Sequence, residues 1–167
     1  MDGQLTDRSH AHAACAVVLD VLRPVIVAAH VDVHTDYSSE MPDAVRRAED
    51  QLAAVGQRRR RRFGDDRMDV VVTRRDPEWL AVETYASWSI NVELEGVDGR
   101  HLGTFHDCGY SIVVDLNDDE VDSMRARLSG VAGVVLLTDM RSRRRHTGSD
   151  RSAGRRRAWL RSRHPSE

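Results

Sequence analysis

The chain has 167 residues, and its basic residues are 25 arginines with no lysine, set against 27 Asp and Glu for a formal net charge of −2. Apolar residues make up 40 %, which at this length allows one domain with a packed core. No run of about 20 apolar residues is present to cross a bilayer, and the amino terminus lacks the pattern of a secretory signal. Two cysteines, Cys15 and Cys108, exclude a disulfide scaffold. We therefore expect a cytoplasmic protein with no membrane partner.

The charge is distributed unevenly along the chain. Residues 1–140 contain fifteen Arg and twenty-five acidic residues, a net of −10, whereas residues 141–167 contain ten Arg and two acidic residues, a net of +8. A bias toward GC-rich codons, typical of a high-GC bacterium, explains the absence of lysine but not this placement. Because residues 141–167 lack apolar periodicity, we expect a disordered basic tail after a single domain at 1–140.

The first third of the sequence predicts a helix, a strand and a second helix. Residues 10–22 are rich in Ala and Leu and follow a candidate cap at Asp7 or Ser9. The apolar run 25–33 is rich in β-branched residues, which favours a strand over a helix there. A further helix is expected from Pro42, ended by Gly56, because its apolar residues recur at helical spacing: Met41, Val45, Ala48, Leu52 and Val55.

A β-meander is predicted in the middle of the chain. Apolar and polar residues alternate over 86–95 and again over 110–116, as expected for half-buried strands. Between them, residues 101–106 form the expected return strand. The sequence Gly-Val-Asp-Gly at 96–99 is typical of a hairpin turn, and a second turn is expected at 107–109.

The remaining elements complete the expected fold class. Residues 68–73 predict a strand, and residues 77–84 fit a short helix with a strand as the alternative. Asn117 and Glu120 form a capping-box pattern before another helix, and residues 134–138 predict a last strand. Together these elements predict an α+β fold, with an antiparallel meander sheet packed against helices on one face.

The sequence His30-Val31-Asp32-Val33-His34 is a candidate metal site. Alternate residues of a strand share one face, so His30, Asp32 and His34 are placed to converge on a divalent metal such as zinc. A His-x-Asp pair that ends an apolar strand resembles the metal-binding strand of a family of zinc-dependent peptidases. The resemblance implies a small metal-dependent hydrolase as an alternative function.

Two further groups form a candidate surface for a ligand or a partner. The first is the turn sequence His106, Asp107, Cys108 and Tyr110, whose residue types also fit an activated thiol beside a base. The second is the set of carboxylates at a helix start, Asp118, Asp119 and Glu120. The sequence contains no complete catalytic set, so we assign no catalytic residues and no cofactor.

The arginine-rich tail is a candidate contact for nucleic acid. Guanidinium groups pair with phosphates and an indole stacks on bases, which selects Arg143, Arg144, Arg145, Arg155, Arg156, Arg157, Trp159 and Arg161. In the alternative interpretation, the tail lies against the acidic body of the same chain.

Three functions follow as hypotheses. The first is a non-enzymatic binding or regulatory module whose partner is a protein or a nucleic acid. The second is an inhibitor or immunity-type protein that binds a basic partner through its acidic face. The third is the metal-dependent hydrolase.

Overall fold

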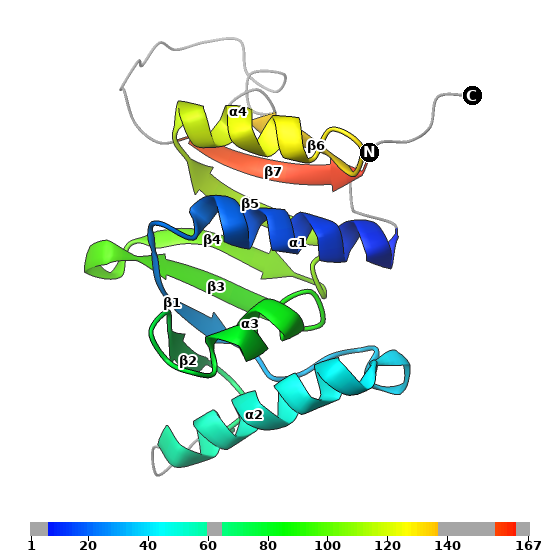
Figure 1. The fold of residues 1–167 in the computed structure, drawn as a ribbon, viewed down its shortest axis with the longest axis vertical. Coiled ribbons are helices and arrows are strands. Elements are labelled where there is room, and N and C mark those ends of the chain that lie inside the picture. The colour runs from blue at the N-terminus through cyan, green and yellow to red at the C-terminus, as the bar shows by residue number, and fades with distance from the viewer. Residues whose placement is uncertain (1–6, 60–64, 137–155, 163–167) are drawn as a thin grey trace.

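The computed structural model describes residues 7–59, 65–136 and 156–162 (Figure 1). The helices are α1 (Arg8–Leu22), α2 (Asp43–Arg59), α3 (Trp79–Tyr85) and α4 (Asp118–Arg127), with short 3-10 turns at η1 (Ser38–Glu40) and η2 (Val97–Gly99). The strands are β1 (Ile26–Val31), β2 (Val70–Thr73), β3 (Asn91–Gly96), β4 (His101–His106), β5 (Ser111–Leu116), β6 (Ala132–Leu136) and β7 (Arg156–Ser162). All seven strands form one sheet in the order β2-β1-β3-β4-β5-β7-β6, and every pairing is antiparallel.

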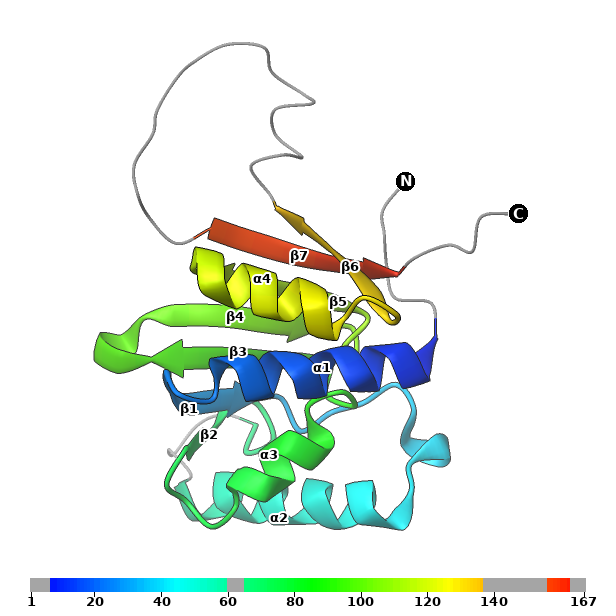
Figure 2. The same cartoon turned by 45° about the horizontal axis from the view of Figure 1, so that its top comes forward.

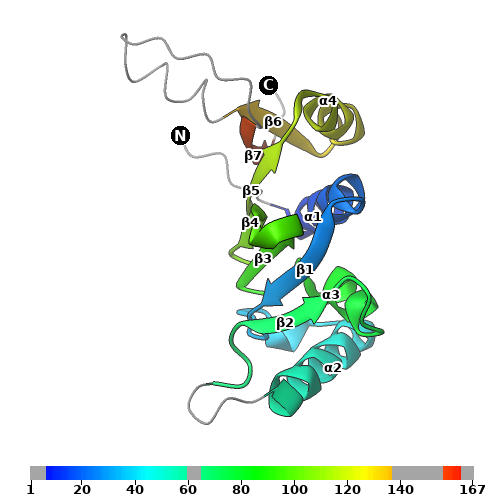
Figure 3. The same ribbon diagram turned by 90° about the vertical axis from the view of Figure 1, so that its left-hand side faces the viewer.

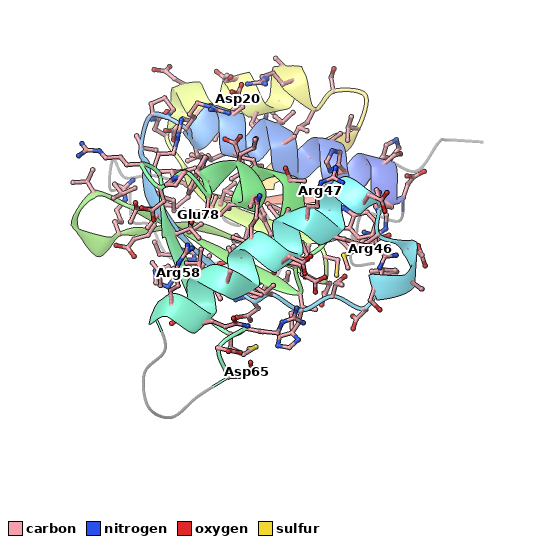
Figure 4. All side chains as sticks on the ribbon, turned by 60° about the horizontal axis from the view of Figure 1, so that its bottom comes forward. Asp20, Arg46, Arg47, Arg58, Asp65 and Glu78 are labelled. Atoms are coloured by element: carbon pink, nitrogen blue, oxygen red, sulfur yellow. The ribbon has the colours of Figure 1, made fainter. Side chains whose placement is uncertain are left out.

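The four helices lie on one face of this sheet (Figures 2 and 3). The core lies between the two layers, and its largest fully buried side chains include Tyr85, Phe105, Leu52 and Leu102. At the β2 end, α2 packs on α3, and the Arg58 guanidinium pairs with Glu78 between these helices (Figure 4). No described helix covers the opposite face of the sheet. The expected α+β class, with helices on one face, is therefore confirmed.

Local sequence signals account for several element boundaries. The Asp7 carboxylate accepts a hydrogen bond from the Ser9 backbone N–H at 2.7 Å and caps α1. Asn117 and Glu120 exchange both hydrogen bonds of a capping box at 2.8 Å, so α4 begins where predicted. Cap residues act on backbone groups within one turn of themselves, which explains why the sequence alone locates them.

The predicted end of α2 at Gly56 is wrong, because the helix continues to Arg59. A Cβ atom at Gly56 would lie 1.8 Å from the backbone oxygen of Asp66. Glycine is therefore required here by the close approach of the following loop and not by a helix terminus.

The meander strands form as predicted, except that β3 begins at Asn91 and not at residue 86. The helical option at 77–84 is confirmed by α3, and the chain then turns: the Trp88 and Ser89 N–H groups donate to the Tyr85 carbonyl at 2.7 and 3.1 Å. Residues 86–89 are all buried, so their apparent strand alternation reflects a turn packed inside the core.

The strand β7 corrects the prediction of a wholly disordered tail. Residues Arg156–Ser162 pair with β5 on one side and with β6 on the other. The sheet thus includes residues beyond the boundary expected near residue 140. The other residues of the predicted tail, 141–155 and 163–167, lie outside the described residues. Among the helices of the described chain, none combines the length and apolar character needed to cross a bilayer.

Candidate functional site

The sheet face opposite the helices carries a group of carboxylates around one histidine. His30 lies in β1, and its register partner in β3 is Glu93, which is exposed. Glu95 lies two residues further along β3, on the same face by strand alternation. Asp69 precedes β2 and Asp32 follows β1. We call Asp32, Asp69, Glu93 and Glu95, together with His30, the acidic sheet face.

The imidazole of His30 bridges two of these carboxylates. Its Nδ1 lies 2.7 Å from Asp69 Oδ1, and its Nε2 lies 2.9 Å from Glu95 Oε2. The Asp69 backbone N–H donates to Asp32 Oδ1 at 2.9 Å, and this hydrogen bond links Asp32 to the same group. Partial burial lowers the pKa of His30, but the hydrogen bonds to Glu95 and Asp69 outweigh it and leave the pKa raised.

The three candidate metal ligands do not converge. His30 is engaged by Asp69 and Glu95, whereas His34 Nε2 lies 3.3 Å from Asp65 Oδ2. Asp32 accepts from the Asp69 backbone. Within the described part of the chain, no three His, Cys, Asp or Glu side chains are arranged to hold a metal ion. The expected alternation ends because β1 stops at Val31, before His34.

The residues of the 106–110 turn differ in burial. His106 is exposed at the end of β4, whereas Cys108 is fully buried, with its Sγ 3.8 Å from Thr35 Oγ1. Asp107 and Cys108 adopt left-handed backbone conformations, with φ of 52° and 56°, so strand alternation does not extend past His106. The other thiol, Cys15, is also buried, and burial raises its pKa, which keeps it protonated and unreactive. The arrangement does not favour an activated thiol.

Tyr110, at the end of the same turn, belongs to a cluster that the sequence did not reveal. The N-terminal end of α1, η1 and the β4–β5 turn lie at the same end of the molecule (Figure 2). There the Arg8 guanidinium carbon lies 3.8 Å from the ring centre of Tyr37, 4.2 Å from that of Trp88 and 5.8 Å from that of Tyr110. These four residues come from four separate segments, so no local pattern predicts the cluster.

The acidic residues at the start of α4 lie apart from this turn. Asp118, Asp119 and Glu120 follow the end of β5, whereas the turn precedes its start. A strand of 6 residues separates the two groups by roughly 20 Å. The structure therefore does not join them into one surface.

The predicted nucleic-acid residues fall into two groups. Arg143, Arg144, Arg145 and Arg155 lie outside the described residues. Arg156, Arg157, Trp159 and Arg161 lie in β7, where Arg157 is the register partner of Asp115 and Trp159 that of Val113.

Comparison with protein-family models, with curated proteins and with solved structures finds no match to this chain. The fold defines an α+β protein with one sheet face free of described helices, and the site must be interpreted from its own chemistry.

Proposed function

We propose that this protein is a non-enzymatic binding module whose acidic sheet face receives a basic segment of a partner protein. The observation that carries the proposal is the exposed Glu93 beside the His30–Glu95 pair, on a sheet face that no described helix covers. This interaction is of the kind made by inhibitor and immunity-type proteins with basic targets.

The geometry of the face suits arginine or lysine side chains from a partner. Glu93 and Glu95 lie two residues apart on the same face of β3, about 7 Å along the strand, so their carboxylates present acceptors side by side. A guanidinium group pairs with such carboxylates through parallel N–H donors. An excess of negative charge also steers a basic partner during its approach, which raises the association rate at low salt.

Charge-neutralising substitutions test this proposal directly. Binding of a fluorescently labelled nona-arginine peptide to the full chain is measured by fluorescence anisotropy, at low and at physiological salt. We expect the double variant Glu93→Gln/Glu95→Gln to bind the peptide about tenfold more weakly, equivalent to about 1.4 kcal/mol. Circular dichroism confirms that each variant is folded.

The matched control removes the same charge elsewhere. Asp118→Asn/Asp119→Asn neutralises two carboxylates at the start of α4, and we expect less than about a twofold change in peptide affinity because only the general charge is altered. Equal losses in both double variants, or no binding by the unsubstituted chain, would show that the acidic sheet face is not a specific site.

A second candidate function rests on the position of β7. We propose that the arginine-rich segment contacts nucleic acid from a fixed place on the folded body, because β7 is hydrogen-bonded between β5 and β6. The register of Arg157 opposite Asp115 supports the competing interpretation, in which this part of the segment lies against the acidic body. The salt dependence of nucleic-acid binding by the full chain separates the two interpretations.

A further inference from the structure

The guanidinium group of Arg8 is packed against aromatic rings, but its terminal nitrogens have no hydrogen-bond acceptor among the residues that the structure describes. Both of these nitrogens, Nη1 and Nη2, are shielded from solvent. A guanidinium group carries five N–H donors and stays charged in proteins. Burying such a charge without an acceptor is strongly unfavourable, so the arrangement calls for an acceptor.

The aromatic neighbours offset only part of this cost. A desolvated cation over an aromatic face is stabilised by the ring's negative face, and Tyr37 and Trp88 lie closest to the Arg8 guanidinium, with ring centres 3.8 and 4.2 Å from it. Ring faces interact with the flat side of a guanidinium group, whereas its N–H bonds lie in the plane and still require acceptors.

The position of Arg8 in the chain adds to the positive potential. It is the first residue of α1, a helix with no acidic residue in its first turn. The positive end of a helix dipole favours an anion and disfavours a cation. The neighbouring Asp7 carboxylate accepts from the backbone N–H and the hydroxyl of Ser9, at 2.7 and 2.5 Å.

We propose that Arg8 is the anchor of a binding site for an oxyanion, a carboxylate or phosphate group carried by a ligand or partner. Tyr37 and Tyr110 form the cover of this site. Both side chains are half-buried, their ring centres are 6.2 Å apart, and both lie in connecting segments outside the helices and strands. The ligand group reaches the guanidinium N–H donors when this pair moves apart. This site would bind an anion, whereas the acidic sheet face would bind a basic segment, so the two proposals can be tested separately.

The test uses two simple oxyanions as probes, inorganic phosphate and acetate, each compared with chloride at equal ionic strength. Ligand binding to the native state raises the melting temperature by mass action. We expect phosphate or acetate to raise the melting temperature of the full chain above the chloride value, and the stronger probe identifies the preferred source of the oxyanion. Arg8→Gln should reduce this increment to the chloride level.

Arg47→Gln is the matched control, because Arg47 is an exposed arginine on α2 (Figure 4). It should retain the full oxyanion response. If Arg8→Gln fails to fold, the unsubstituted chain is titrated with phosphate or acetate and followed by two-dimensional NMR. The indole N–H signal of Trp88 should then move more than those of the other two tryptophans. An equal response in Arg8→Gln, or the absence of any oxyanion-specific response in the unsubstituted chain, overturns the proposal.

Discussion

His30 Nδ1 lies 2.7 Å from Asp69 Oδ1, and this contact connects the second strand of the sheet to the start of its edge strand β2. Asp69 holds a left-handed backbone conformation with φ of 52°, which costs of order 1 kcal/mol for a non-glycine residue. The other nitrogen of the same ring contacts Glu95 of β3 at 2.9 Å. One imidazole thus joins three neighbouring strands across the acidic sheet face.

This bridge predicts a pH-dependent contribution to stability. The pKa of His30 is raised in the folded protein, so its contribution is fully present below the unfolded value of about 6.5 and is lost as the pH rises through the folded pKa. We expect His30→Gln to lower the free energy of unfolding by about 1 kcal/mol at pH 5.5. The difference between the variant and the unsubstituted protein should shrink toward pH 8.5, as measured by urea denaturation.

His106→Gln is the control for this experiment, since it removes an exposed histidine at the end of β4. A surface change of this kind alters stability by less than about 0.5 kcal/mol. If the His30→Gln difference is constant across the pH range, the imidazole does not carry the bridging charge that the geometry indicates.

Gly56→Ala should destabilise the protein even though alanine is the better helix former. In an exposed helix this change gains about 1 kcal/mol, but here the added Cβ would meet the Asp66 carbonyl oxygen at 1.8 Å. We expect a net loss of about 2 kcal/mol, the usual range for overpacking. Gly130→Ala provides the comparison, because its Cβ would have no neighbour within 4 Å. A stabilising Gly56→Ala would show that the loop does not pack on α2 in this way.

Asn117→Ala should remove the cap of α4 and cost about 1 kcal/mol in thermal or chemical unfolding. The cause is the loss of an acceptor for the Glu120 backbone N–H, which lies 2.8 Å from Asn117 Oδ1. Asn117→Ser keeps a capping oxygen and should recover most of the loss. A variant pair with equal stabilities would contradict the role of the cap.

The nucleic-acid hypothesis needs point substitutions, because deleting residues 141–167 would also remove β7 from between β5 and β6. The triple variant Arg143→Gln/Arg144→Gln/Arg145→Gln leaves β7 intact. We expect it to weaken binding to a labelled RNA or DNA oligonucleotide and to reduce the slope of log affinity against log salt by up to about three. The control variant, Arg46→Gln/Arg47→Gln/Arg75→Gln, removes three exposed arginines elsewhere. Equal effects of the two triple variants would show that the chain binds the oligonucleotide only through non-specific charge attraction.

The features that the sequence predicted well depend on short stretches of chain. The meander strands, the 107–109 turn and the Asn117 cap each follow from alternation or from hydrogen bonds within a few residues. The metal hypothesis used the same logic of alternation, but its third residue, His34, falls beyond the end of β1. Local reasoning also misread residues 86–89, where a buried turn has the composition of a strand.

The sequence by itself determined an acidic α+β body, its caps and the order of its meander, because these depend on neighbours in the chain. Only the tertiary structure placed Asp69 and Glu95 beside His30, from 39 and 65 residues away. Only the tertiary structure inserted β7 between β5 and β6 and gathered three aromatic rings around Arg8. Such contacts arise when strands pair and helices pack, so their partners are set by the sheet register and not by proximity along the chain.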